Sequence, residues 1–286
     1  MKYKILFPSE PFLNNNTVDS SFLGEYNVCK TLGFDIYLFD YDILLEEGKF
    51  KSNINSNTEG VFIYRGWMLK PNEYELLYNY IKDVTNNKSK LISDYYEYRN
   101  LHCFPHIYHL IKDYTPKIEV IEQYDKLSSY KDVIKKIDYD FFIKDFVKSI
   151  KTDKGVERID KNISCVDLFD KINSFIEERG NLFTGGIVLK EFVNLKKIDN
   201  KTNEWRIFVI DGKVICTLQN SNLDTYDKPP INMINIVSCI LYKYSNFFTV
   251  DFAQLEDDNW VVIETGDGQV SGISNESDYV KLYNNI

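Results

Sequence analysis

Two acidic residues near the C-terminal end have a spacing that suits metal binding. Asp251 and Glu264 lie in two β-rich runs, 247–255 and 260–265, which flank the acidic segment 256–259. This pattern predicts a β-hairpin. A loop of two or four residues places the two carboxylates directly opposite each other on one face, with Cβ atoms about 5 Å apart.

In this register Leu255 pairs with Trp260, and a loop of three or five residues would break it. Like charges that face each other across two strands destabilise the pair unless a counter-ion offsets them. Carboxylate oxygens suit Mg²⁺ that is shared with nucleotide phosphates. The alternative is one exposed carboxylate and one satisfied by the backbone.

A glycine-rich segment, 266–272, follows the hairpin and holds three of the 13 glycines of the chain. Such a backbone turns tightly and lets a ligand approach closely. An acidic strand pair that leads into a glycine-rich loop is the strongest indication of a site in this sequence.

Composition predicts a globular protein of two domains, since the 286 residues are 44% hydrophobic and 27% charged. No apolar run approaches the roughly 18 residues of a membrane span. The five cysteines are scattered and form no C-x-x-C pair, which favours reduced thiols and a cytoplasmic location. A net charge of −9 argues against duplex nucleic acid as a partner, although a local basic groove over residues 144–154 remains open.

The N-terminal third alternates strand and helix patterns. Expected strands cover 3–7, 34–39, 61–64 and 91–92, and expected helices cover 19–32 and 72–84. Alternating βαβ units predict a small, largely parallel sheet through about residue 93. Arg65 follows the end of one strand, where open α/β sheets place ligand groups; a surface arginine is the alternative.

From about residue 117 the pattern changes to α+β. Lys144 and Lys148 share a face of a strand expected over 141–148, where an unpaired lysine must reach water or an anion. A further strand is expected over 187–193, and it contains Lys190 followed directly by Glu191. Arg206 lies on a hairpin that turns at Asp211-Gly212. Its charge is expected either to bind an anion or to form a surface salt bridge.

The three histidines, His102, His106 and His109, have a spacing that a zinc site could use. Pro105 suits a first helical turn, however, so His102 is expected outside the helix that follows. Ordinary polar positions on an amphipathic helix are therefore the preferred interpretation.

Taken together, these residues resemble the ATP-grasp superfamily, and within it the clade named for one arginine and two lysines. The resemblance rests on the order of five features: Lys144, the segment 189–193, Arg206, Asp251 and Glu264. The runs 64–67, 143–148 and 264–269 carry the likeness to the clade.

The resemblance implies a Rossmann-like N-terminal domain (1–95) followed by an ATP-grasp domain (96–286) of two α+β subdomains, about 96–185 and 186–286. It also implies roles for individual residues. Lys144 and Lys190 would contact ATP, Glu191, Phe192 and Val193 would bond the adenine edge through their backbone, and Arg206 would bind phosphate. Asp251 and Glu264 would hold Mg²⁺, and Asp267 is a candidate third ligand because Gly266 stands where many relatives have Asn. Expected substrate contacts are Arg65, Lys148, Gln269 and Ser271, with Arg206 and Lys144 as catalytic residues.

The implied activity is that of an ATP- and Mg²⁺-dependent ligase, which activates a carboxylate as an acyl phosphate for capture by an amine. Phosphoryl transfer needs cations and metals that neutralise developing charge. Two alternatives remain: a ligase or phosphotransferase acting on RNA ends, and an ATP-binding regulator with degenerate catalysis.

Overall fold

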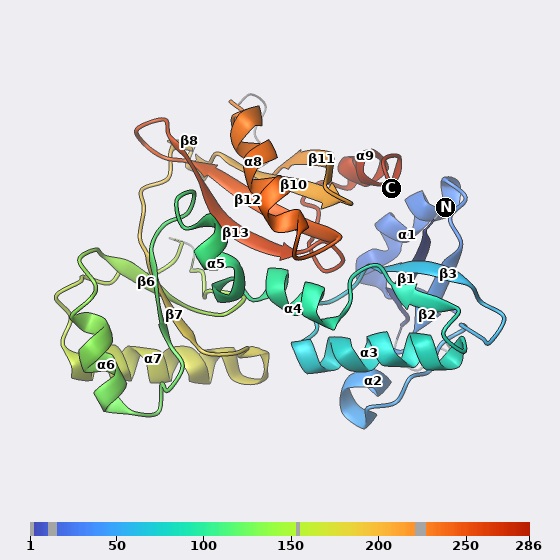
Figure 1. Ribbon diagram of the computed structural model, residues 1–286, viewed down its shortest axis with the longest axis horizontal. Helices are drawn as coiled ribbons and strands as arrows, with labels where there is room; N and C mark the ends of the chain where they lie inside the picture. The colour runs from blue at the N-terminus through green and yellow to red at the C-terminus, as the bar shows by residue number, and fades with distance from the viewer. Residues whose placement is uncertain (1–2, 11–15, 153–154, 221–226) are drawn as a thin grey trace.

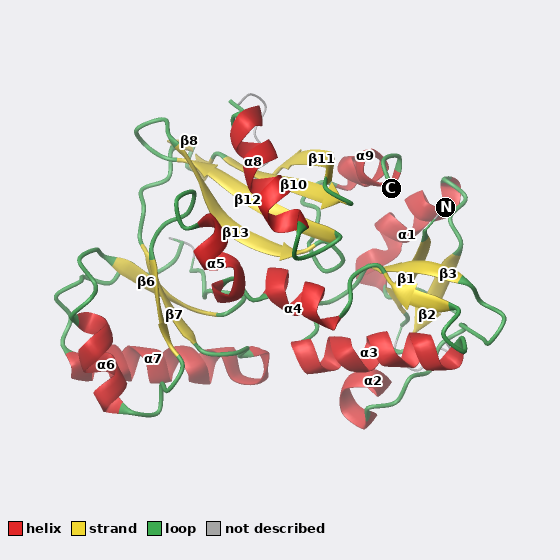
Figure 2. Cartoon of the chain, viewed as in Figure 1, coloured by secondary structure: helices red, strands yellow, loops and turns green. Residues whose placement is uncertain are grey.

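The computed structural model describes residues 3–10, 16–152, 155–220 and 227–286. Strands in this part of the chain form three main sheets and one short ladder, shown in yellow in Figure 2. The N-terminal and middle sheets lie toward opposite ends of the molecule, and the C-terminal sheet lies between and above them in Figure 1. No helix among the described residues is long and apolar enough to cross a membrane.

The N-terminal sheet is parallel, as the alternating pattern predicts. Its strands run in the order β2-β1-β3-β4. They are β1 (Lys4–Pro8), β2 (Ile36–Phe39), β3 (Gly60–Tyr64) and β4 (Ser89–Leu91). The helices are η1 (Ser20–Phe22), α1 (Leu23–Thr31), α2 (Tyr41–Glu47) and α3 (Pro71–Val84), of which α2 was not predicted.

The middle sheet is antiparallel in the order β5-β7-β6. Its strands are β5 (Ile118–Ile121), β6 (Phe141–Asp145) and β7 (Ile187–Glu191), with the helices α6 (Leu127–Ile134), α7 (Cys165–Arg179) and η2 (Gly180–Leu182). Because β7 pairs with β5 and β6, it belongs to the middle sheet, although the predicted subdomain boundary at about 185 assigned it to the last subdomain.

The C-terminal sheet is antiparallel in the order β11-β10-β12-β13. Its strands are β10 (Glu204–Ile210), β11 (Lys213–Gln219), β12 (Phe247–Gln254) and β13 (Trp260–Asp267). The predicted turn at Asp211-Gly212 joins β10 to β11, and both residues have positive φ, 48° and 74°. The remaining elements are α4 (Tyr95–His102), α5 (Pro105–Ile111), β8 (Lys197–Ile198), β9 (Lys201–Thr202), α8 (Ile231–Tyr242), η3 (Glu276–Asp278) and α9 (Tyr279–Tyr283).

Apolar packing is continuous between the N-terminal and C-terminal sheets. Ile5 and Phe7 of β1 share one buried cluster with Phe208 of β10 and Phe247 of β12. A second cluster packs α4, α5 and α8 against the C-terminal sheet. Helices α4 and α5 therefore belong structurally with the C-terminal sheet, although they precede the middle sheet in sequence.

Candidate active site

The acidic pair forms as predicted, but through a different hairpin. Asp251 of β12 lies directly opposite Glu264 of β13. Near the turn, however, Gln254 pairs with Trp260, so the predicted pairing of Leu255 with Trp260 is wrong. The register shifts between Asp251 and Phe252, which leaves one extra residue in β13 and restores the opposition of the two acids.

Each acid already has a cation partner within the chain. Arg206 lies opposite Asp251 on the neighbouring strand β10 and binds its carboxylate at both ends, with Nε–Oδ1 2.8 Å and Nη2–Oδ2 2.6 Å. Its Nη1 donates to the carbonyl oxygen of Gly272 in the glycine-rich loop, at 2.7 Å. Two parallel N–H···O bonds make this pair directional as well as attractive.

Glu264 is paired from the middle sheet. Lys144, which is only 2% exposed, donates from Nζ to Glu264 Oε1 at 2.6 Å. Burial acts to raise the pKa of Glu264, but Lys144, Lys148 and Lys190 outweigh that effect and hold the pKa at about 2. Glu264 is therefore ionised at neutral pH, and Lys144 supplies the counter-charge that the acidic pair needs.

Lys190 lies on the same face of the middle sheet as Lys144. Its Nζ lies 4.1 Å from the centre of the Phe104 ring and donates to the carbonyl oxygen of Ile263, at 2.5 Å. Ile263 is the extra residue of β13. Burial and the charge of Lys144 lower the pKa of Lys190 to about 7, against a smaller opposing effect of Glu264.

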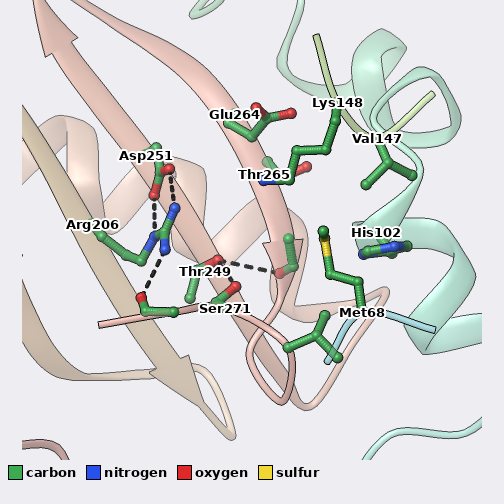
Figure 3. A pocket seen from close by; sticks show the side chains of 13 residues that line it. Met68, His102, Val147, Lys148, Arg206, Thr249, Asp251, Glu264, Thr265 and Ser271 are labelled. Atoms are coloured by element: carbon green, nitrogen blue, oxygen red, sulfur yellow. Dashed lines mark hydrogen bonds and ion pairs between the residues drawn. The ribbon is translucent and has the colours of Figure 1, made fainter. Parts of the chain in front are cut away.

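A pocket of about 50 Å³ lies beside the acidic pair, which is room for a few water molecules. Figure 3 shows its lining, which comes from strands β10, β12 and β13, from the loops after β3, β6 and β13, and from the end of α4. The lining residues are Met68, His102, Val147, Lys148, Arg206, Thr249, Asp251, Glu264, Thr265, Gly266, Val270, Ser271 and Gly272. Predicted residues Lys148, Arg206, Asp251, Glu264 and Ser271 are thus brought together.

Lys148 reaches this pocket by a turn rather than by strand alternation. Strand β6 ends at Asp145, whose Oδ1 accepts hydrogen bonds from the backbone N–H groups of Val147 and Lys148, at 2.7 and 2.6 Å. The strand predicted over 141–148 is therefore too long. The side chain of Asp145 folds the chain back and directs Lys148 toward Glu264 (Figure 3).

Asp267 lies away from the acidic pair. Alternation along β13 puts it on the face opposite Glu264, where it is fully buried. Its Oδ1 accepts two hydrogen bonds from Gln269, both 3.0 Å. The described residues include no group of three or more His, Cys, Asp or Glu side chains that could hold a metal. The structure therefore does not support Asp267 as the third ligand.

Two predicted substrate residues connect the glycine-rich loop to the N-terminal sheet instead. Arg65 is buried, donates to Glu25 at 2.7 Å and donates to the carbonyl oxygen of Gly268 at 2.6 Å. Gln269 accepts from the backbone N–H of Tyr64 at 3.1 Å and donates to the hydroxyl of Tyr74 at 2.8 Å. Neither Arg65 nor Gln269 lines the pocket, so the structure gives both a supporting role.

The segment expected to bind adenine follows β7. The N–H groups of Glu191 and Phe192 donate to the carbonyl oxygens of Lys117 and Asp140, at 2.8 and 2.7 Å. An adenine contact through this segment would therefore use carbonyl oxygens or the N–H of Val193. The side chain of Glu191 accepts from the backbone of Lys117 and stays half-buried.

Sequence reasoning assigned no site role to five residues of the pocket outside the glycine-rich segment: Met68, His102, Val147, Thr249 and Thr265. As predicted, Pro105 begins a helix and His102 lies outside it, since His102 ends the preceding helix α4. Its proximity to the pocket comes from the packing of α4 against β13. No local sequence signal indicates that contact.

The fold and this site together define an ATP-grasp protein. The family described as "ATP-grasp domain, R2K clade family 3" matches residues 83–286, so the chain belongs to that family. The comparison with curated proteins found no match.

Solved structures of similar fold cover nearly the whole chain. A D-cycloserine synthetase, DcsG, has a TM-score of 0.59 at 12% identity, over 98% of this chain and 97% of its own. The ATP-grasp ligase PsnB, complexed with a minimal precursor, has a TM-score of 0.60 at 12% identity, over 99% and 98%. The macrocyclase MdnC from Microcystis aeruginosa MRC, bound to the precursor peptide MdnA, has a TM-score of 0.58 at 11% identity, over 98% and 99%.

Proposed function

We propose that this protein activates a carboxylate as an acyl phosphate with ATP and Mg²⁺ and joins it to an amine. The observation that supports this proposal is a set of two ion pairs at the pocket, in which each carboxylate is bonded to a cation of the chain. Arg206–Asp251 and Lys144–Glu264 pair two cations with two carboxylates, and Arg206, Asp251 and Glu264 line one small cavity. Phosphoryl transfer needs both: cations for the phosphate oxygens and carboxylates for the metal.

The acidic pair fits Mg²⁺. This ion is usually held by one or two carboxylates together with substrate phosphates and water, so two carboxylates on one face suffice. Asp251 and Glu264 would hold the ion, which would supply charge neutralisation at the transferred phosphoryl group. Arg206 and Lys144 are bonded to these acids, and they would turn to the phosphates as the metal takes their place.

The proposed reaction has two steps. A carboxylate oxygen attacks the γ-phosphorus, the new O–P bond forms, and the bond to the β-phosphate oxygen breaks to release ADP. The amine nitrogen next attacks the acyl carbon, the C–N bond forms, and the C–O bond to phosphate breaks. Lys144 and Arg206 would hold the phosphoryl oxygens during the first step, and Lys148, which lines the pocket, would hold the carboxylate.

Product analysis tests this proposal. The protein is incubated with ATP, Mg²⁺ and pooled amino acids and short peptides, and nucleotides are then resolved by chromatography. We expect ADP and inorganic phosphate in step with a new amide, and no AMP. Glu264→Gln should abolish turnover, whereas Asp257→Asn, at the exposed tip of the same hairpin, should leave it unchanged.

The RNA-end alternative predicts AMP and a lysine that becomes adenylylated. Lys144 is held in an ion pair with Glu264, whereas burial lowers the pKa of Lys190 to about 7, so Lys190 is the better nucleophile of the two. Intact-mass analysis distinguishes the cases. A mass gain of one adenylyl group that disappears in Lys190→Arg or Lys144→Arg, with AMP as product, would replace the carboxylate–amine proposal. Lys154 of the basic groove lies outside the described residues.

A further inference from the structure

His102 is a buried polar side chain that the charge network does not use. It is 5% exposed, and its ring stacks on the ring of Tyr98 with centroids 4.8 Å apart. No hydrogen bond joins the imidazole of His102 to another of the described residues. A buried imidazole that lines a pocket without a protein partner has its hydrogen-bonding capacity available to a ligand.

The pocket has two unlike walls. Arg206, Asp251 and Thr249 form a charged and polar wall on the C-terminal sheet, on the left of Figure 3. The side chains of Met68 and Val147 lie with His102 on the other side. This second wall is mostly apolar, and it combines the N-terminal domain, the loop after β6 and the end of α4.

His102 adds no charge to its wall at neutral pH. Burial, then Lys148 and Lys144, lower its pKa to about 3, and Glu264 opposes this only in part. A neutral imidazole presents one N–H donor and one nitrogen acceptor. An anion that enters the pocket finds stronger partners in Arg206 and Lys148, so the imidazole is better suited to an uncharged group.

We propose that His102, Met68 and Val147 form the subsite for the incoming nucleophile, and that this nucleophile is an uncharged primary amine on a small apolar group. The inference rests on the proposed function and names the chemistry of its second substrate. The amine N–H donates to the imidazole acceptor, and the apolar group lies against Met68 and Val147. An ammonium would lie beside Lys148, and both carboxylates that line the pocket are already paired, Asp251 with Arg206 and Glu264 with Lys144.

This arrangement leaves the amine lone pair free to attack. As the C–N bond forms and the C–O bond to phosphate breaks, the nitrogen loses one proton to the departing phosphate. His102 positions the nitrogen and keeps the same protonation state throughout. Its role is therefore substrate binding, with no proton transfer of its own.

Nuclear magnetic resonance tests the subsite without turnover, because the chain has only three histidines. The Cε1–H signal of His102, assigned with His102→Asn, is followed while small probes are added to the protein with Mg²⁺ and ADP. O-methylhydroxylamine serves as an amine that is uncharged at neutral pH and carries a methyl group. Ethylammonium, acetate and inorganic phosphate serve as cationic and anionic probes.

We expect O-methylhydroxylamine to shift the His102 signal saturably, at concentrations at least severalfold lower than the other probes need. The exposed His109 should not respond. A stronger response to phosphate or acetate would make this an anion subsite and overturn the proposal. An equal response to ethylammonium, or no response to any probe, would overturn it as well.

Kinetics provide a second measurement once an amide product is found. His102→Asn should raise the KM for the amine at least tenfold while the Kd for Mg²⁺–ATP stays within about twofold. His109→Asn on α5 is the matched control and should change neither value. If the protein makes no ADP but the histidine signal still responds to the neutral amine, the ligase proposal fails and the amine subsite stands.

Discussion

Arg206 and Asp251 face each other across β10 and β12 and share two hydrogen bonds, of 2.8 and 2.6 Å. This contact changes the energetics of the acidic pair. Repulsion between Asp251 and Glu264 is offset within the chain, because Arg206 binds one acid and Lys144 the other. Metal binding is therefore an exchange of partners rather than the relief of an unbalanced charge.

Asp251→Asn should destabilise the protein by roughly 1–3 kcal/mol, since Arg206 loses its counter-charge while remaining mostly buried. The amide still accepts one hydrogen bond, so the fold should persist. Thermal melts with and without Mg²⁺–ATP measure both effects, and the variant should lose the stabilisation by Mg²⁺–ATP. A variant as stable as the wild type, with full nucleotide stabilisation, would refute the metal assignment.

Lys144→Ala and Lys190→Ala should each weaken ATP binding at least tenfold, and Lys148→Ala much less. The first two lysines are buried at the centre of the network, whereas Lys148 is half-buried and lines the pocket. Isothermal titration of the three variants measures the difference. Equal losses in all three would indicate a diffuse basic groove and favour the nucleic-acid alternative.

ATP affinity should fall as the pH rises from 7 to 9, because Lys190, with a pKa of about 7, loses the proton that attracts phosphate. Below that pKa the affinity should level off. Between about 7 and the ordinary value of 10.5 the unfolded chain binds more protons at this residue, so its contribution to folding stability increases with pH. Titration of wild type and Lys190→Met is the check: a pH dependence that survives in the variant would come from another group.

Asp267→Asn should stabilise the protein at pH 8. Burial raises the pKa of Asp267 to about 7 despite the hydrogen bonds from Gln269, so the folded state binds the extra proton between about 3.8 and 7. This proton contributes fully to folding stability below the unfolded-state pKa of 3.8, and the contribution is lost as the pH rises through the folded-state pKa of about 7. Asparagine keeps an acceptor for Gln269 without the charge. Denaturant melts at pH 5 and pH 8 should show a larger gain at pH 8 than at pH 5, and a loss at both would assign Asp267 a role that needs its charge.

The sequence predicted the strands that carry the site better than the contacts within it. Period-two alternation and the Asp-Gly turn identify β10 and β11, because those signals are local. The opposition of Asp251 and Glu264 was predicted correctly from a wrong loop length, since a bulge in β13 compensates for it. A bulge of this kind leaves no mark in the apolar pattern of 260–265.

Residues whose surroundings come from distant segments were the ones misjudged. Arg65 was expected to meet substrate, yet Glu25 and the carbonyl of Gly268 surround it. His102 was weighed as a metal ligand and as an ordinary polar residue but not as a pocket residue, because its pocket forms when α4 packs beside β13. Burial and long-range packing decide these roles, and neither can be read from spacing along the chain.

The extra residue in β13 links the length of a turn to the position of a lysine. Ile263 carries the carbonyl oxygen that accepts from Lys190, and it exists as an extra residue only because the turn before it has an odd length. A related chain with a turn one residue shorter or longer would need no bulge and would lose this acceptor. Among homologous sequences, we therefore expect the length of this turn, the bulge in β13 and the lysine at position 190 to change together.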